Sequence, residues 1–339
     1  MSLARAIETG DVAQLPSRRD EDWHWTDLRG LIRELPSPSA QIAGALPIGP
    51  FDALAERTVA VANGRGPVES AGEGVTALRI VGQGDGAHAA DHMIAVPAGA
   101  SLVLLESYEG EGAHVAELDL AIRLGEGARL ERIVLADEDA AAVIVSRADV
   151  ELAPGASFAQ TVIASGARRQ RLETRVSHPG GGASARLDGL YVLADQRHAD
   201  ITTVVTHEGM DGTTEQLTKG VVRDQARGVF QGRIVVQPGA DKTDARMGHH
   251  ALILSERAEV DAKPELEIFA DDVACAHGNT VGALDEDALF YAEQRGIPEP
   301  EARALLTEAF LGEVIDRIAH EGAREVVRAW VAERLRVSA

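Results

Sequence analysis

The stretch GARLERIVLA at residues 127–136 has a near-copy on each side, GASLVLLE at 99–106 and GASFAQTVIA at 155–164, and a fourth copy, GASARLDGLYVL, at 182–193. The alanines of the four Gly-Ala pairs are 28, 28 and 27 residues apart. A fixed period in this range is typical of solenoids and propellers, which stack one structural unit on the next. No helical period intervenes between the copies. The repeat therefore predicts a stack of short strands joined by tight glycine turns.

The length of the repeat separates the candidate architectures. A propeller blade usually takes ~40 or more residues, so the shorter unit favours one coil of a parallel β-helix. A β-sandwich is the structural alternative. Two looser echoes, QARGVFQGRIVV at 225–236 and RAEVDAKPELEI at 257–268, follow at intervals of 43 and 32 residues. These intervals predict an inserted segment or a drifted coil.

Three regions of the chain differ in their pattern of polar and apolar residues. Residues 1–70 are expected to form an N-terminal helical region and connector, with Ser17 able to cap a helix whose first turn is acidic. Residues 71–283 are expected to form the β-helix core. Residues 284–339 change to a helical period and are expected to form a C-terminal helical region.

The C-terminal region carries its own start and stop signals. Asp285 can cap a first helix, which Gly296 ends, and Pro298 or Pro300 opens a second helix. Apolar residues recur along the second helix at helical spacing, and a third helix follows it. These are Ala302, Leu305, Leu306, Ala309, Phe310, Val314 and Ile318. Such helices could cover the end of a solenoid or dock a partner protein.

Charge and composition exclude several classes of function. The 339 residues include 33 Lys+Arg and 54 Asp+Glu, and the net charge of −21 repels nucleic acid and anionic membranes. The basic run Arg168, Arg169, Arg171 and Arg175 is expected to be a solvated turn. No stretch is long and apolar enough to span a membrane, and the start lacks an apolar export signal. The lone Cys275 excludes an intramolecular disulfide and a closed zinc site, and it fits a cytoplasmic, reducing location.

One dense polar stretch, DDVACAHGNT at 271–280, could carry chemistry. On a strand, Val273, Cys275 and His277 share one face. Residues two apart lie roughly 7 Å from each other. That spacing is wide for one metal ion but suits two neighbouring ligands on a surface completed by another chain. The alternative is a Cys packed as a small apolar residue and a histidine bonded to a backbone carbonyl.

Other candidate sites are weaker. His249 and His250 fall on opposite faces of an expected strand, so they form no chelate. Asp271 and Asp272 could be the paired carboxylates of a polysaccharide-cleaving β-helix. No lysine or arginine nearby marks the basic role, so we favour a solvated turn. The chain also lacks the P-loop, H-E-x-x-H and G-x-S-x-G motifs.

A family resemblance covers the polar stretch. KPELEIFADDVACAHGNTVGALDEDALFYAEQRGIPEPEA, residues 263–302, closely resembles the C-terminal signature of the SufD branch of the SufB/SufD family, subunits of the SufBCD iron–sulfur cluster assembly complex. FQGRIVVQPGADKTDARM at 230–247 and LPSRRDEDWHWTDL at 15–28 are similar to other segments of that family. The Cys-x-His-Gly form favours SufD over SufB. The chain departs from the common pattern at Ala276, Asn279 and Ala292.

The resemblance implies a fold and an assembly. It implies a right-handed parallel β-helix flanked by N-terminal and C-terminal helical regions. It implies a non-catalytic scaffold that forms a heterodimer with SufB and binds the SufC ATPase through its C-terminal helices. A homodimer is a candidate state of the isolated chain. The alternative functions are a carbohydrate-active β-helix enzyme and a passive β-solenoid adhesin.

The resemblance also implies the site residues and cargo. A transient Fe–S cluster would form at the interface with SufB, with His277 and Cys275 as interface residues and iron ligands, a role that suits imidazole and thiolate. Reduced flavin is a candidate cofactor of the whole complex, and no cofactor is expected in the isolated chain. The residues expected to dock SufC are Asp285, Phe290, Tyr291, Arg295 and Gly296.

Overall fold

Seventeen parallel strands alternate between two sheets in the computed structural model, which describes residues 1–336. The odd sheet contains β1 (Arg57–Ala62), β3 (Gly74–Gln83), β5 (Ser101–Glu111), β7 (Arg129–Asp137), β9 (Ser157–Ala164), β11 (Ser184–Leu193), β13 (Thr213–Val222), β15 (Asp244–Ile253) and β17 (Ala274–Gly282). The even sheet contains β2 (Glu69–Ala71), β4 (Ala87–Val96), β6 (Val115–Leu124), β8 (Val143–Leu152), β10 (Arg169–His178), β12 (His198–His207), β14 (Arg227–Val236) and β16 (Glu259–Ile268).

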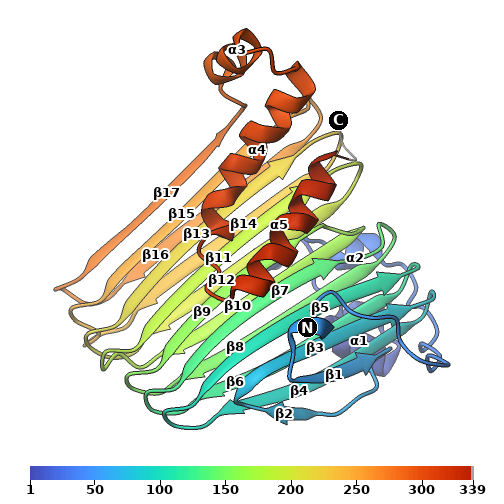
Figure 1. The fold of residues 1–339 in the computed structure, drawn as a ribbon. Coiled ribbons are helices and arrows are strands. Elements are labelled where there is room, and N and C mark those ends of the chain that lie inside the picture. The colour runs from blue at the N-terminus through green and yellow to red at the C-terminus, as the bar shows by residue number, and fades with distance from the viewer. Residues whose placement is uncertain (337–339) are drawn as a thin grey trace.

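Each strand pairs with the strand two places away in the sequence, so the chain winds as a β-solenoid of about eight turns (Figure 1). The register joins Ser101 to Arg129, Arg129 to Ser157, and Ser157 to Ser184. These pairs reproduce the period of 28, 28 and 27 residues. The prediction of a parallel β-solenoid is confirmed, and the all-parallel pairing excludes the antiparallel β-sandwich.

The Gly-Ala pairs mark the corners before β5, β7, β9 and β11. Gly99, Gly127 and Gly155 have φ of 71°, 65° and 69°, the left-handed region that glycine adopts without a Cβ clash. The alanines Ala128 and Ala156 are fully buried beside them. Each of these coils therefore turns on a glycine and fills the inside of its corner with a methyl group.

The two longer intervals have different origins: that of 32 residues is a lengthened coil, since Arg227 pairs with Glu259, whereas that of 43 residues is not an inserted coil. The echoes at 225–236 and 257–268 correspond to β14 and β16, which belong to the even sheet, whereas the earlier copies lie in the odd sheet. The interval of 43 residues thus joins strands of different sheets. The odd strands continue without a missing coil, because Ser184 pairs with Thr213 and Thr213 with Asp244.

The solenoid also begins earlier than expected. β1 starts at Arg57, inside the region that the sequence assigned to the connector. Upstream of it lie α1 (Leu3–Thr9), α2 (Leu28–Leu31) and the short 3₁₀ turns Val12–Gln14, Glu21–Trp23 and Asp52–Leu54. Ser17 caps no helix, since the 3₁₀ turn Glu21–Trp23 has Asp20 at its N-cap and the Ser17 hydroxyl and backbone N–H both donate to Asp20 Oδ2.

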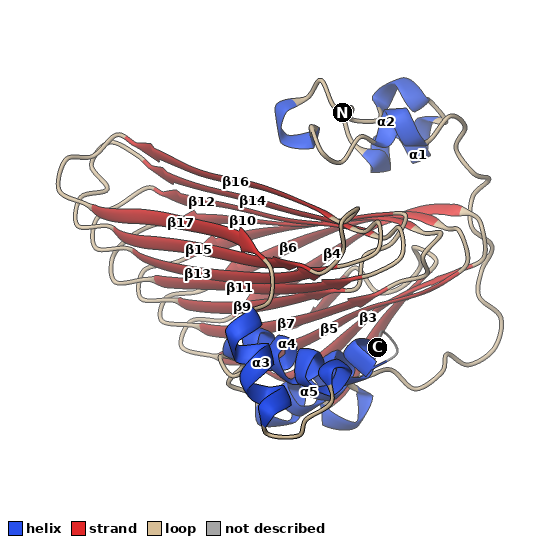
Figure 2. Cartoon of the chain, turned by 90° about the horizontal axis from the view of Figure 1, so that it is seen from above, coloured by secondary structure: helices blue, strands red, loops and turns tan. Residues whose placement is uncertain are grey.

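The two terminal regions cover opposite outer faces of the solenoid (Figure 2). The segment 1–35 lies on the even sheet, and its apolar side chains Leu3, Ala6 and Leu28 pack with Val115 and Val143. The helices α4 (Glu299–Ile315) and α5 (Glu321–Arg336) lie along the odd sheet, while α3 (Glu286–Gln294) projects beyond it (Figure 1). Residues 337–339, which fall in the predicted C-terminal region, lie outside the described residues.

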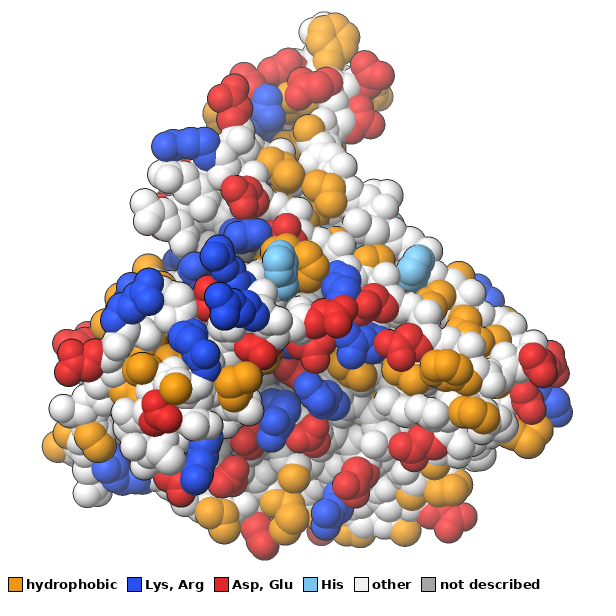
Figure 3. Space-filling view, turned by 180° about the vertical axis from the view of Figure 1, so that it is seen from behind, with side chains coloured by type: hydrophobic (Ala, Val, Ile, Leu, Met, Phe, Trp, Pro, Cys, Tyr) orange, Lys and Arg blue, Asp and Glu red, His pale blue; other side chains and the backbone are white. Residues whose placement is uncertain are grey.

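The expectation that the basic run at residues 168–175 is a solvated turn is only partly correct. Arg168 and Arg175 are exposed as expected, but Arg171 is fully buried. Its guanidinium bonds to Asp200 at 2.7 Å and to Glu173 at 2.8 Å, and it lies 4.5 Å from the centre of the Trp23 ring. Figure 3 shows this side of the molecule, where other Lys and Arg side chains gather at the surface.

The C-terminal helices pack beside the sheet and do not close the stack. Leu311, Val314 and Val327 join Ile133 and Leu190 of the odd sheet in one buried cluster. The apolar stripe expected on the second helix is therefore partly correct. Val314 and Ile318 are buried, but Leu305 is 49% exposed and Leu311 replaces it in the interface.

Candidate functional site

The two ends of the solenoid differ in how they are covered. At the N-terminal end, the turn after β1 is pinned by Asn63, which is 4% exposed and whose amide donates to Ala40 O and Gln83 O. At the C-terminal end, β16 is half-buried at most and β17 is exposed along nearly its whole length. Each of these last strands has a ladder partner on one side only, β14 and β15 respectively, as β1 and β2 do at the other end. The edges at the C-terminal end are longer, with 10 and 9 residues against 6 and 3, and we call this end the open end.

Every second residue of β17, from Cys275 to Val281, continues a row of inward-pointing residues of β15, and we call these residues the inner row of β17. The register aligns Cys275, His277, Asn279 and Val281 with Ala245, Met247, His249 and Ala251 of β15. The β15 residues point into the solenoid, where all four are buried. The same row of β17 has no further coil above it. The prediction that Cys275 and His277 share a strand face is therefore confirmed.

Cys275 sits at the margin of the core. It is half-buried and packs at the edge of the cluster formed by Phe230, Ile234 and Met247. Burial raises the pKa of the Cys275 thiol above its usual value, opposed by a hydrogen bond from the Ala245 backbone. The thiol is therefore protonated at neutral pH in the isolated chain, and it becomes a thiolate ligand only when a metal displaces that proton.

His277 occupies a different environment. Its side chain is exposed, and it makes no hydrogen bond with any residue in 1–336. Both ring nitrogens are accessible, so a metal could bind one of them without breaking an internal contact. The interpretation of His277 as a buried histidine bonded to a carbonyl is wrong for this structure.

The open end does not by itself complete a metal site. Across residues 1–336, no three His, Cys, Asp or Glu side chains gather closely enough to hold a metal ion. An iron–sulfur cluster usually takes four protein ligands. An exposed imidazole and a nearby thiol are suitable donors for iron, but they supply only part of such a set. The missing ligands would have to come from another molecule at the open end.

The other polar pairs behave as the sequence predicted. His249 points into the solenoid and His250 points outward, where its Nδ1 lies 2.7 Å from Thr280 Oγ1. Asp271 and Asp272 lie in the exposed turn before β17, and neither carboxylate forms an ion pair within the described chain. What the sequence reasoning missed is that His249 touches Asn279 of β17, a contact between neighbouring strands that strand alternation alone does not reveal.

The helix α3 presents a second exposed surface. Asp285 accepts hydrogen bonds from the backbone of Asp287 and Ala288, and Gly296 follows the helix with φ of 85°, so both predicted ends are confirmed. Phe290 and Tyr291 are each 61% exposed. Arg295 donates to the Tyr291 hydroxyl at 2.5 Å and stacks on its ring. Figure 3 shows hydrophobic side chains at the tip of this projection, a feature typical of a protein contact.

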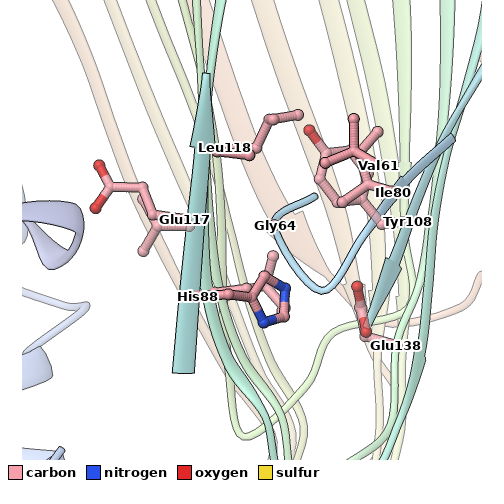
Figure 4. Close-up of a pocket in the computed structure, with 12 residues that line it drawn as sticks. Val61, Gly64, Ile80, His88, Tyr108, Glu117, Leu118 and Glu138 are labelled. Atoms are coloured by element: carbon pink, nitrogen blue, oxygen red, sulfur yellow. The ribbon is translucent and has the colours of Figure 1, made fainter. Parts of the chain in front are cut away.

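A small buried pocket lies at the opposite end of the solenoid (Figure 4). His88, Tyr108 and Glu138 point toward it, whereas Glu117 points away from it toward the N-terminal segment. Its volume of about 10 Å³ has room for one water molecule at most. Burial lowers the pKa of His88 to about 4, so this imidazole is neutral. The pocket is too small to be a substrate site.

No helix within residues 1–336 combines the length and the apolar character needed to cross a membrane.

Comparison with known proteins shows the family of this chain. Residues 79–310 match the family model described as SUF system FeS cluster assembly, SufBD core domain. The iron–sulfur cluster assembly protein SufD of Escherichia coli is 32% identical over 72% of this chain and 58% of its own length. SufD of Bacillus subtilis is 34% identical over 43% of this chain and 33% of its own.

A further relative spans almost the whole chain. An iron–sulfur cluster assembly SufBD family protein of Mycobacterium tuberculosis is 27% identical over 97% of this chain and 91% of its own length. The chain therefore spans little more than half of the E. coli protein but most of the mycobacterial one. These matches favour cluster assembly over a carbohydrate-active enzyme. The chain belongs to the SufBD family of SUF-system iron–sulfur cluster assembly proteins, and it is of the SufD type.

Proposed function

We propose that this chain is a non-catalytic scaffold subunit of the SUF machinery, which pairs through its open end with SufB in the cytoplasm. The observation that carries this proposal is the pair of unpaired edges on β16 and β17. Exposed edges invite strand addition by another chain. The apolar side chains Ile268, Phe269 and Val281 are 41%, 60% and 44% exposed at this end, which adds a hydrophobic contribution to such pairing.

The nascent cluster is the cargo of this interface. In this proposal His277 supplies an imidazole ligand to iron, and SufB supplies the ligands that this chain lacks. Cys275 contributes less, because its thiol packs at the core margin and must lose a proton first. Cys275→Ser is accordingly expected to reduce cluster content less than His277→Ala.

The C-terminal helices connect the scaffold to the ATPase SufC. The exposed residues Phe290 and Tyr291, with Arg295 stacked on Tyr291, form the contact surface, and Asp285 and Gly296 fix the helix that presents them. Because α4 packs on the odd sheet, a displacement of α3 by SufC can be transmitted to the solenoid. Nucleotide-driven dimerisation of SufC would then reshape the open end, which requires a two-state element biased by the nucleotide.

The proposal assigns no resident cofactor to the isolated chain. Reduced flavin belongs to the assembled complex in this account, and its absorbance in the purified complex tests for it. A homodimer of the isolated chain would use the same two edges as SufB, so SufB is expected to displace it.

Co-purification tests the proposal directly. The chain is expressed together with SufB and SufC, as wild type, as Val281→Lys on the inner row of β17, and as Val68→Lys, a control whose valine is 66% exposed before β2. We expect Val281→Lys to lose SufB and keep SufC, since a charge on the edge opposes strand pairing. Full recovery of SufB by Val281→Lys would contradict the proposal, as would a wild-type chain that purifies with neither partner.

A further inference from the structure

A chain of hydrogen bonds runs through the solenoid interior and ends at the open end. The Tyr191 hydroxyl of β11 lies 3.0 Å from Nε2 of His249, and Nδ1 of His249 lies 2.7 Å from Oδ1 of Asn279. Tyr191 and His249 are completely buried, whereas Asn279 is exposed on the inner row of β17. These hydrogen bonds therefore link an interior residue to the row that carries His277.

The donors along this chain can be assigned by elimination. Within the described residues the Tyr191 hydroxyl has no hydrogen-bond partner besides His249. If Nε2 carried the imidazole proton, the Tyr191 O–H would be a buried donor without an acceptor, which is costly. Tyr191 therefore donates to Nε2, and His249 carries its proton on Nδ1 and donates to Asn279. Burial lowers the pKa of His249 to about 4, so the ring holds one proton at neutral pH.

Packing holds the His249 and Tyr191 rings in place. The His249 ring is stacked on Phe230 with ring centres 4.7 Å apart and an angle of 1° between the planes. The Tyr191 ring lies in a slot between Gly220 of the odd sheet and Gly228 of the even sheet. A Cβ atom on these glycines would come within 1.9 Å and 2.5 Å of the ring, so only glycine leaves the slot open.

The last group in this series of hydrogen bonds is the Asn279 amide nitrogen. Since Oδ1 accepts from His249, the NH₂ group faces away from that ring, at the open end. His277 precedes Asn279 by two residues on the same row, roughly 7 Å along the strand. Hydrogen bonds to sulfur are among the factors that set the potential of an iron–sulfur cluster.

We propose that Tyr191 and His249 are positioning residues that hold the Asn279 amide as a hydrogen-bond donor to an anionic sulfur ligand, a sulfide or thiolate, on iron bound at His277. The inference rests on the function proposed above. It adds a residue two positions from His277 and a buried relay that orients it.

The structure provides a matched control one residue along each strand. His250 of β15 and Thr280 of β17 form the same kind of contact at 2.7 Å, but on the outer face of the odd sheet. This pair lies beside the relay in the sequence and cannot reach the inner row. His250→Phe and Thr280→Val therefore report any effect of disturbing these strands alone.

The first experiment tests the relay in the isolated chain. Nitrogen NMR of labelled histidine distinguishes the two neutral tautomers of His249. We expect protonated Nδ1 in the wild type. In Tyr191→Phe, which keeps the ring in its slot and removes only the hydroxyl, we expect Nδ1 to stay protonated and the signal of the unprotonated Nε2 to shift, because this nitrogen has lost its hydrogen-bond donor. A wild-type His249 protonated on Nε2 would overturn the inference. This result does not depend on cluster assembly.

The second experiment measures the cluster in the complex with SufB and SufC. Loss of a hydrogen bond to sulfur should make the reduction potential more negative in Asn279→Ala, and in Tyr191→Phe by a smaller amount. The double variant should match Asn279→Ala, because the two residues act as one unit. His250→Phe and Thr280→Val should match the wild type.

The outcomes separate the two proposals. An unchanged potential in Asn279→Ala, with a cluster that still requires His277, would overturn the inference and leave the proposed function standing. A normal cluster in His277→Ala would overturn both, since no iron-bound sulfur would then lie beside Asn279.

Discussion

Arg171 is a charged residue held inside the protein, between the even sheet and the N-terminal segment. It forms ion pairs with Asp200 and Glu173, whose side chains are 0% and 5% exposed. Its Nη1 also donates to the backbone carbonyl of Asp22 at 2.7 Å. The Thr26 hydroxyl donates to the same Asp200 carboxylate at 2.5 Å. These contacts make Arg171 the link between the segment RRDEDWHWTDL at 18–28 and the solenoid.

We predict that Arg171→Ala destabilises the chain by roughly 3–5 kcal/mol, because it leaves the buried Asp200 carboxylate without its cation. Urea unfolding followed by circular dichroism gives the free energy of unfolding. Arg175→Ala is the control, since Arg175 pairs with the same Glu173 but its side chain is 48% exposed, and it should cost about 1 kcal/mol or less. Equal and small losses in both variants would show that Arg171 does not anchor the segment.

The sequence alone predicts the placement of a side chain where that placement depends on a single strand. Alternation along β17 was enough to place Cys275 and His277 on one face. The burial of Arg171 depends on Trp23 and Asp22, about 150 positions away, and the relay to Asn279 depends on three strands. Neither arrangement has a local signal.

The C-terminal helices combine a structural part and an exposed part. The helices α4 and α5 bury Leu105, Ile133 and Leu190 of the odd sheet, so deleting residues 284–339 would expose that apolar face. Helix α3 has few such contacts and only Leu289 buried. Point substitutions on α3 are therefore a cleaner test of docking than a deletion.

We predict that Phe290→Ala and Tyr291→Ala each weaken capture of SufC at least tenfold while the melting temperature stays unchanged. The reason is that exposed aromatic side chains commonly supply much of the affinity of an interface, where one such residue can contribute about 2 kcal/mol or more. Binding of purified SufC to immobilised chain provides the measurement. Ile48→Ala, which removes an 89% exposed isoleucine from the N-terminal connector, should bind as the wild type does. Wild-type affinity in both α3 variants would place the SufC site elsewhere.

The N-terminal segment meets the even sheet at a carboxyl group with an unusual pKa. Glu117 of β6 accepts a hydrogen bond from the Ala4 backbone at the start of α1. Burial, with a smaller contribution from Asp119, raises the pKa of Glu117 from 4.5 to about 7. The folded state therefore binds more protons than the unfolded state between these two values. The contribution of Glu117 to stability falls as the pH rises through this range and stays low above it.

We predict that Glu117→Gln stabilises the chain at pH 8 by up to about 3 kcal/mol relative to wild type, and by much less at pH 5. The amide can still accept from Ala4 and carries no charge to bury. Urea unfolding at both pH values measures the difference, with the exposed Glu126→Gln as control. A variant that is equally or more destabilised at pH 8 would mean that the carboxylate is favourable as a charge.

At the scale of the whole molecule, the solenoid ends on two short strands at one end and on two long, exposed strands at the other, and it is covered along both sides (Figure 2). The period of the four Gly-Ala copies was enough to predict the stacked coils. The later coils gave a weaker signal because their positive-φ turn positions are taken by Asp195, Asp224 and Lys242 as well as glycine. Which end is open could not be predicted, because that depends on where the helices pack after the last strand.

The central claim is that a cluster is assembled at the open end with His277 as a ligand. The most direct test measures iron and acid-labile sulfide per assembled complex for His277→Ala, with the melting temperature of the same sample and His250→Ala as the control. We predict normal assembly with SufB and SufC, an unchanged melting temperature, and iron and sulfide far below the wild-type and control values. Wild-type iron and sulfide in the His277→Ala complex would contradict the account.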